Sequence, residues 1–181
     1  MKKLLAVTLV LALILAGCAA APAATKHGMA SITTIGFSSD LADKDGVKSG
    51  LAQADTMMCS VVVDANGKVV DIKIDTVQSK VNFDEAGKIT TDKATEFKTK
   101  RELGDAYGMK KASGIGREWY EQVDAIQKWM VGKTADQIKA MKVKTTEKEG
   151  NVADEADLVT SATIGIDEFI KVAVKAIENA K

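Results

Sequence analysis

The alternation of apolar and polar residues is clearest between residues 56 and 78. Ile72 and Ile74 alternate with charged residues, so one face of this segment is buried and the other faces water. Apolar runs rich in β-branched residues flank Asn66-Gly67, and this dipeptide is typical of a tight hairpin because a type I′ turn needs a positive φ at both central residues. The pattern therefore predicts an antiparallel β-hairpin.

Apolar residues recur at helical spacing in three later segments. The spacing predicts a helix over residues 117–130, with Ser113 or Gly116 as its N-cap. A shorter helix is expected to follow, with Thr134 as its N-cap. Residues 166–180 carry a continuous apolar stripe opposite charged residues, which predicts an amphipathic helix that packs on the core.

Weaker signals complete the pattern. Residues 31–39 are β-branched and aromatic and predict a first strand. Short strands are expected at 81–83 and at 95–99. Strands followed by helices in this order predict one α+β domain over residues 31–181. We expect a mostly antiparallel sheet, with the hairpin at 56–77 packed against helices that include the C-terminal amphipathic helix.

The first residues have the pattern of an export signal. Lysines precede an apolar run that is too short to span a membrane, and the run ends at Leu15-Ala16-Gly17-Cys18. This ending resembles the lipobox of bacterial lipoproteins, whose cysteine is diacylated and becomes the first residue of the mature chain. An ordinary cleaved signal with a chance cysteine is the alternative interpretation.

The lipobox resemblance implies an arrangement of the N-terminal region. Residues 1–17 would be a signal peptide, and Cys18 would be the lipidation site that anchors the protein to the extracytoplasmic face of the cell membrane. Two or more acyl chains make a stable anchor, whereas one does not. Residues 18–30 are mostly small and weakly patterned, which predicts a flexible tether between the anchor and the domain.

Composition and charge argue against several classes of protein. Lys+Arg and Asp+Glu are equal at 25 each, and no basic cluster stands out, so no nucleic-acid partner is expected. His27 is the only histidine, which argues against a histidine-based metal site or a Ser-His catalytic pair. With Cys18 lipidated, Cys59 has no partner for an internal disulfide. Its apolar neighbours predict a buried, unreactive thiol.

Three hydroxyl residues precede the last predicted helix, within the stretch "DLVTSAT" at residues 157–163. Thr160, Ser161 and Thr163 have a simple structural interpretation, because Ser and Thr favour turns and helix caps. Gly165 is then the expected N-cap of the helix.

The same stretch resembles the attachment motif of the FMN-binding domain family. That family includes the flavin subunits of sodium-pumping quinone reductase and many cell-surface lipoproteins. Its pattern is Asp, two free positions, Ser or Thr, Gly, Ala and Thr. Asp157, Thr160, Ala162 and Thr163 match this pattern, and Ser161 departs from it where Gly is usual. In the family, a flavin transferase that uses FAD and magnesium attaches FMN to the last Thr through a phosphodiester.

The family resemblance implies a function and a set of FMN-binding residues. Thr163 would hold FMN covalently, with Asp157, Thr160, Ser161 and Ala162 shaping the turn. Residues 98–123 resemble the family segment that carries a Leu-Gly loop against the flavin ring. The candidates for an apolar shelf beneath that ring are Leu103, Met109 and Tyr107.

The resemblance also implies partners and a role. The protein would be a membrane-anchored electron carrier rather than an enzyme with its own substrate. It would need a flavin transferase for maturation and a membrane or extracellular redox partner. A positive φ at Ser161 would add strain of about 1–2 kcal/mol. The alternative is a flavin-free surface or binding lipoprotein of the same fold, in which these residues cap the helix.

Overall fold

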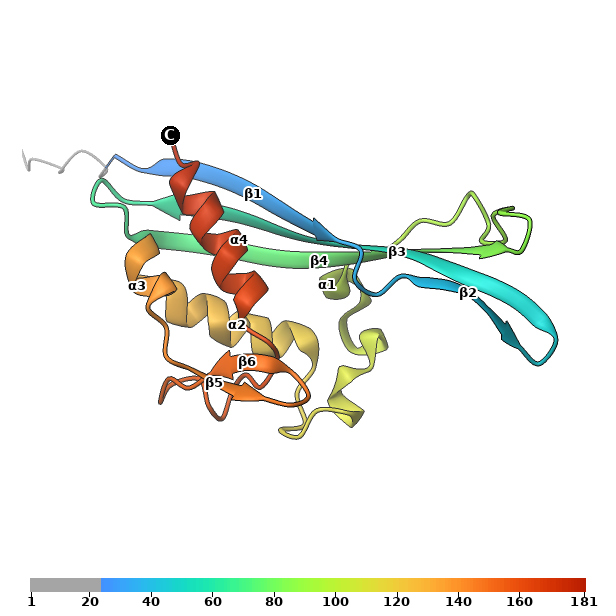
Figure 1. The fold of residues 1–181 in the computed structure, drawn as a ribbon. Coiled ribbons are helices and arrows are strands. Elements are labelled where there is room, and N and C mark those ends of the chain that lie inside the picture. Colours follow the sequence, from blue (N-terminus) through green and yellow to red (C-terminus); the bar gives the residue numbers. More distant parts are fainter. Residues whose placement is uncertain (1–23) are drawn as a thin grey trace, which may run out of the picture.

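A computed structural model describes residues 24–181 (Figure 1). The expected signal peptide and the lipidation site Cys18 lie outside the described residues. Strand β1 (Lys26–Thr34) begins inside the segment that the sequence predicts as a tether. Residues 26–30 therefore belong to the sheet and not to a flexible linker.

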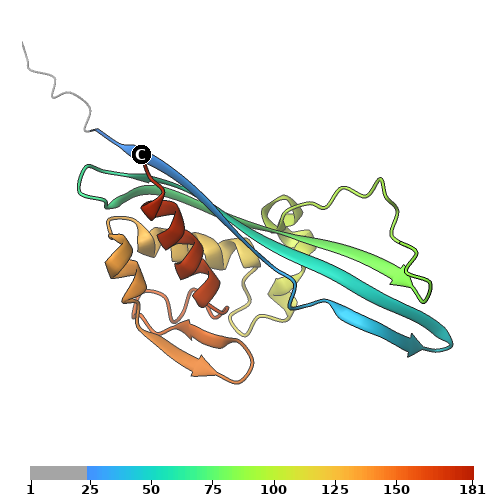
Figure 2. The ribbon, with the colours of Figure 1, turned by 45° about the horizontal axis from the view of Figure 1, so that its top comes forward.

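Two long strands, β3 (Val47–Val63) and β4 (Val69–Asp84), form the centre of a four-stranded antiparallel sheet. Strands β1 and β2 (Ser39–Lys44) both pair antiparallel with the other edge of β3, at different points along it. This arrangement confirms the predicted α+β class and the predicted hairpin, which is longer than its pattern indicated. Figures 1 and 2 show that the first half of β3, the second half of β4 and β2 extend together beyond the helices. We call this extension the arm.

The other strand predictions are only partly right. Residues 31–39 do not form one strand, because a turn separates β1 from β2. Residues 81–83 are the end of β4. The strand expected at 95–99 is wrong, since that segment makes only one isolated bridge, between Thr99 and Val77.

The three predicted helices are present as α2 (Trp119–Met130), α3 (Ala135–Lys139) and α4 (Asp167–Glu178). Thr134 caps α3 as predicted, and its side chain accepts a hydrogen bond from the Gln137 amide. The predicted cap of α2 is wrong. Its N-cap is Glu118, whose backbone N–H donates to the Glu121 carboxylate over 2.7 Å. None of the described helices has the length and apolar character needed to cross a membrane.

Five short elements have no counterpart in the sequence analysis. They are α1 (Lys100–Leu103), η1 (Gly104–Tyr107), η2 (Met109–Lys111), β5 (Val143–Thr146) and β6 (Gly150–Ala153). The first three join β4 to α2, and β5 pairs with β6 in a separate two-stranded hairpin.

The core lies between one face of the sheet and helices α2 and α4, which cover that face near the chain termini (Figures 1 and 2). We call this the inner face. Ile74 on β4, Ile126 on α2 and Val172 on α4 are fully buried. Helix α4 approaches β1 so closely that a Cβ atom on Gly28 would lie 2.0 Å from the Ala176 carbonyl oxygen. Burial of these apolar side chains is the main stabilising contribution to the domain.

Candidate functional site

The stretch 157–163 belongs to a turn between β6 and α4 and does not cap the helix. The N-cap of α4 is Ile166, and no side chain forms a capping hydrogen bond there. Gly165 is instead bridged to Val152 of β6. The capping interpretation is therefore wrong, because the backbone of Gly165 is engaged by β6 and the helix starts only beyond it.

Buried side chains hold this turn in place. Leu158 is 1% exposed and Ala162 is 2% exposed, and the amides of Ser161 and Ala162 both donate to the Leu158 carbonyl oxygen over 2.8 Å. Asp45 is the one non-glycine residue with a positive φ within residues 24–181. Ser161 therefore has an ordinary φ, and its departure from the family's Gly introduces no backbone strain.

The motif's side chains do not converge on one site. Asp157 and Ser161 line a cavity of about 600 Å³ beside Trp129. Thr163 lines a different cavity of about 500 Å³, and Thr160 is exposed and lines neither of them. The residues were expected to lie together, but Asp157 and Ser161 lie on one side of the turn and Thr163 on the other, while Ala162 is buried.

We call the second space the threonine cavity. It is lined by Thr163, Ile164, Met109, Ile115, Lys144 and Lys148, among others. Three of these side chains are apolar and two are cationic, and the lysines come from β5 and the turn that follows it. Glu149 lines the cavity as well, and its carboxylate pairs with the Lys148 Nζ over 3.3 Å. The cavity therefore combines an apolar wall, the cation Lys144, the Lys148–Glu149 pair and the hydroxyl of Thr163.

Gln122 of α2 fixes the position of Thr163. Its amide is almost fully buried, and its Oε1 accepts a hydrogen bond from the Thr163 backbone N–H over 2.9 Å. The Thr163 hydroxyl lies 3.5 Å from the same oxygen. The Gln122 Nε2 donates to the Arg117 carbonyl over 3.3 Å. Sequence reasoning missed Gln122, although its helical spacing from Trp119 and Ile126 places it on the buried face.

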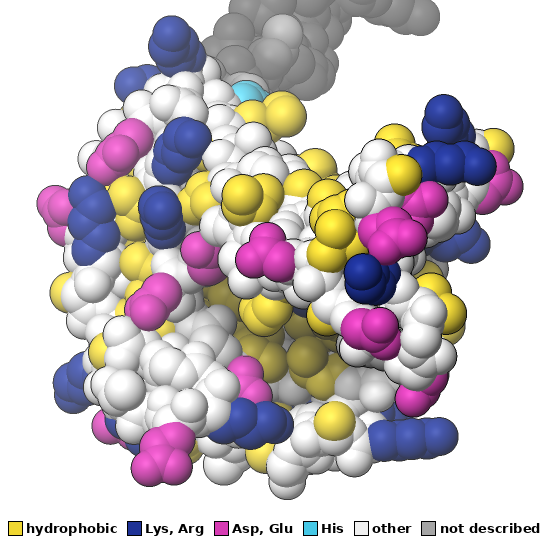
Figure 3. All heavy atoms as spheres, turned by 45° about the vertical axis from the view of Figure 1, so that its right-hand side comes forward, with side chains coloured by type: hydrophobic (Ala, Val, Ile, Leu, Met, Phe, Trp, Pro, Cys, Tyr) yellow, Lys and Arg dark blue, Asp and Glu magenta, His cyan; other side chains and the backbone are white. Residues whose placement is uncertain are grey.

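A second space, which we call the recess, adjoins the threonine cavity. It has a volume of about 330 Å³, and Met109, Glu149 and Ile164 line both spaces. The inner face of the sheet forms its floor, and Trp119 and Phe169 contribute to its walls, with ring centroids 6.2 Å apart. Figure 3 views the molecule from the side of the arm and shows a hollow with hydrophobic side chains inside and charged side chains around it.

The three candidates for the apolar surface beneath the flavin ring lie in different places. Met109 lies beside Thr163 in the threonine cavity. Leu103 is half-buried on α1 and lines neither the threonine cavity nor the recess. Tyr107 lies beneath the ammonium group of Lys100, with the Nζ atom 4.8 Å from the ring centroid.

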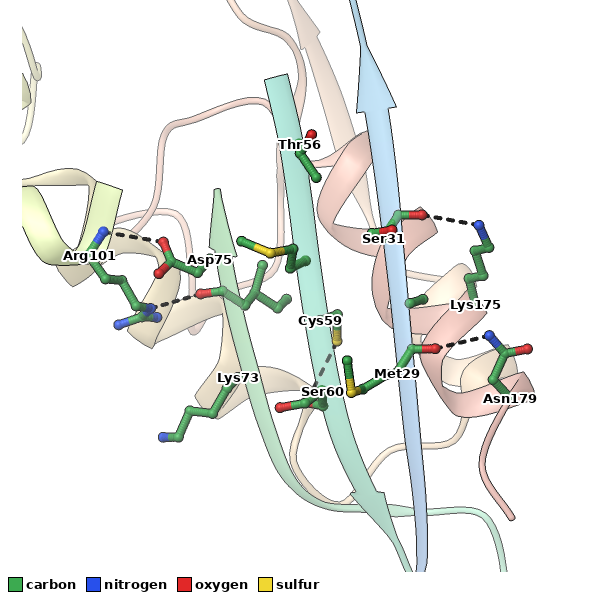
Figure 4. A pocket seen from close by; sticks show the side chains of 13 residues that line it. Met29, Ser31, Thr56, Cys59, Ser60, Lys73, Asp75, Arg101, Lys175 and Asn179 are labelled. Atoms are coloured by element: carbon green, nitrogen blue, oxygen red, sulfur yellow. Dashed lines mark hydrogen bonds between the residues drawn. The ribbon is translucent and has the colours of Figure 1, made fainter. Parts of the chain in front are cut away.

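A larger hollow of about 990 Å³, the outer groove, lies on the opposite face of the sheet. Two of its three cations already have partners, as Figure 4 shows for Arg101 and Lys175. The Arg101 Nε donates to the Ile74 carbonyl over 2.8 Å, and another guanidinium nitrogen pairs with Asp124 over 2.8 Å. The Lys175 Nζ donates to the Ser31 carbonyl over 3.1 Å. These groups fasten neighbouring helices to the edges of the sheet.

Two further observations concern metal binding and cysteine reactivity. Within residues 24–181, no group of three or more His, Cys, Asp or Glu side chains is arranged to hold a metal ion. Cys59 is 2% exposed, and burial raises the pKa of its thiol to about 12. The prediction of a buried, unreactive thiol is confirmed, since the thiolate is the reactive form.

The chain is similar over part of its length to chlorophenol reductase of Desulfitobacterium hafniense. The two are 30% identical over 114 residues, a match that covers 47% of this chain and 35% of that reductase. The chain thus spans about a third of the length of this relative. No family model and no solved structure matches the chain. It is therefore a distant, partial homologue of a reductase.

Proposed function

We propose that this protein is a lipid-anchored electron carrier on the extracytoplasmic face of the membrane, with FMN attached to Thr163. The observation that supports this proposal best is the position of Thr163. Its side chain lines a cavity of about 500 Å³ that also contains two lysines and an apolar wall. This volume lies within the range of roughly 300–1,000 Å³ that is common for small-molecule sites.

The residues of the threonine cavity suit the separate parts of FMN. Lys144 provides positive charge for a phosphate group joined to the Thr163 oxygen, and Lys148, which pairs with Glu149, lies in the same lining. Met109 and Ile115 provide apolar surface for the ring. When bound, FMN supplies one- and two-electron transfer, and the protein's part is to hold, orient and shield it.

The surroundings of Thr163 support attachment by a separate enzyme. Within the described residues, the hydrogen-bond partner of its hydroxyl is the amide oxygen of Gln122, which cannot act as a base. A threonine hydroxyl without a base beside it is a poor nucleophile. We therefore propose that a flavin transferase attaches the FMN, as in the family that the motif resembles.

Two further observations support a redox role outside the cytoplasm. The partial homologue is named a reductase. The lipobox resemblance at Cys18 would keep the carrier at the membrane, and a covalent bond would prevent an extracytoplasmic cofactor from diffusing away. The electron donor or acceptor would then be a membrane or extracellular redox protein.

The test is production of the exported chain together with a flavin transferase. We expect the mass to increase by one FMN less one water, with yellow colour that remains after denaturation. The Thr163→Ala variant should lose both signals. Thr95→Ala is the matched control, because Thr95 is exposed, lies outside the motif and lines neither cavity.

Two results would contradict the proposal. One is unmodified protein despite an active transferase, and the other is FMN that stays covalently bound in Thr163→Ala. Either result would leave the flavin-free surface lipoprotein as the better interpretation. The anchor is tested separately with Cys18→Ala, which should release the protein from membranes without changing its fold.

A further inference from the structure

Thr76 on β4 carries the one buried side-chain polar atom without a hydrogen-bond partner in residues 24–181. The residue is 5% exposed. Its backbone N–H donates to the Asp75 carboxylate over 2.7 Å, but its hydroxyl oxygen has no partner. A buried hydroxyl without a partner is destabilising, and such an atom in a native fold calls for a physical explanation.

The recess offers an explanation, because Thr76 is one of its lining residues. Thr76 lies opposite Met57 in the register of β3 and β4, and both residues form part of the floor of the recess. Trp119 and Phe169 are almost fully buried beside the same space. A hydroxyl that can donate or accept one hydrogen bond thus lies among aromatic and sulfur-containing side chains.

The charges around the recess disfavour an anionic ligand. Asp55, Glu149 and Glu168 are among its lining residues and disfavour an anion. Lys100 is the one cation in the lining, and its Nζ lies 5.2 Å from the centroid of the Trp119 ring. This ammonium group stacks on aromatic faces. A volume of about 330 Å³ is small for a ligand site and suits one or two fused rings.

From these observations we propose that the recess binds a small aromatic molecule that bears no negative charge and carries one oxygen substituent. The rings of Trp119 and Phe169 contact the ligand ring, and the Thr76 hydroxyl forms a hydrogen bond with the ligand oxygen. This site differs from the threonine cavity, because neither Thr76 nor Phe169 lines that cavity and Thr163 does not line the recess.

The position of the recess links it to the proposed function. Ile164 and Met109 lie between the two spaces and line both of them. If FMN is attached to Thr163, a molecule in the recess lies next to the flavin site and is a candidate small-molecule redox partner. This link rests on the proposed function, whereas binding in the recess does not.

The test uses the expected mature chain from Cys18 onwards, made in the cytoplasm and therefore free of flavin. The chain has two tryptophans, and Trp129 does not line the recess. Titration with acetophenone should shift the Trp119 indole signal in a ¹⁵N–¹H NMR spectrum in a saturable way and leave the Trp129 signal unchanged. A Trp129→Phe variant assigns the two signals.

A matched ligand and a matched variant isolate the hydrogen bond. α-Methylstyrene has nearly the shape of acetophenone but lacks its oxygen, and we expect it to bind about tenfold more weakly. Thr76→Val should weaken acetophenone binding by a similar factor and leave α-methylstyrene binding unchanged. Thr33→Val is the control, since the Thr33 hydroxyl pairs with Thr56 at an exposed position.

Three outcomes would overturn the proposal. The first is the absence of a saturable shift of the Trp119 signal. The second is acetophenone binding that is equal in Thr76→Val and the unaltered chain, since water would then satisfy the hydroxyl. The third is loss of acetophenone binding in FMN-loaded protein, which would show that the flavin ring itself occupies the recess. A failure of flavin attachment leaves all measurements on flavin-free protein unaffected.

Discussion

The two faces of the sheet carry hollows of very different character. The outer groove has about three times the volume of the recess, at about 990 Å³ against about 330 Å³. Two of the three cations that line the outer groove, Arg101 and Lys175, are already bonded to strand carbonyls. The recess is smaller, but the hydroxyl of Thr76 in its lining has no partner. The reason for proposing a ligand in the recess is therefore an unpartnered polar atom among buried side chains, and not the volume of the space.

The difference between the faces comes from the alternation of residues along β4. Ile74 and Thr76 point to the inner face, where α2 and α4 cover them, while Lys73 and Asp75 point to the outer groove. A polar residue on the outer face has access to water. A polar residue on the inner face needs a partner within the protein or a ligand.

The largest expected effect comes from removing inner-face packing. Ile74→Ala should lower the free energy of unfolding by about 2–5 kcal/mol, because Ile74 is 0% exposed and its truncation leaves a cavity. Lys73→Ala, one residue away on the outer face, should change it by less than about 0.5 kcal/mol. Urea denaturation of both variants measures the contrast. Equal losses would show that the two faces do not differ as described.

A smaller loss is expected at the amide that holds Thr163. Gln122→Ala should cost about 1–3 kcal/mol, since it removes a buried amide and leaves the part-buried Thr163 N–H without its acceptor. It should also reduce flavin attachment by a transferase, because the turn is less well fixed. Lys128→Ala, on the exposed face of the same helix, is the control for both measurements. Unchanged stability in Gln122→Ala would mean that water replaces the amide at no cost.

Cys59 predicts a decline in stability at alkaline pH. Burial raises the pKa of its thiol from 9.0 to about 12. Below pH 9 the thiol is protonated in both states, so it adds no pH dependence. Between pH 9 and 12 the unfolded chain loses the proton first, and stability falls by at most about 1.4 kcal/mol per pH unit. Denaturation at pH 8, 9 and 10 should show this decline, and Cys59→Ala should show a smaller one.

The smallest effect is expected at the rim of the outer groove. Lys175→Met removes a hydrogen bond to the Ser31 carbonyl at an exposed position. Water can replace this bond, so stability should stay within about 0.5 kcal/mol of the unaltered chain. Thermal denaturation measures the difference. A loss of several kcal/mol would show that this bond is essential for holding α4 on β1.

The elements predicted correctly are those whose signals are local. Asn66-Gly67 marks the turn of the hairpin, although the turn is not the expected type I′. Gly67 has a φ of 73° but Asn66 has no positive φ, and the turn closes between Asp64 and Gly67. Thr134 caps α3 through a bond to a residue only three positions away. The apolar stripe of 166–180 gave the last helix because helical periodicity is contained in the order of residues. In each case, residues close together in sequence are sufficient to specify the structure.

The errors concern contacts between distant segments. Gly165 was expected to cap α4 but pairs with Val152 instead. Ser113 was expected to cap α2, but Glu118 does so, and its carboxylate also accepts hydrogen bonds from the amides of Met109 and Lys110. Local propensities could not show these outcomes, since they depend on which segment packs beside each turn.

The sequence by itself determined the hairpin, the order of the helices and the presence of a threonine-containing motif before the last helix. Only the tertiary structure decided that Thr163 and Asp157 face different cavities and that Thr76, far away in sequence, lines a recess next to Thr163. The physical reason is that periodicity and turn chemistry act over a few residues. A cavity exists only where α2, α4 and the sheet pack together, and the register of that packing selects the side chains that line it.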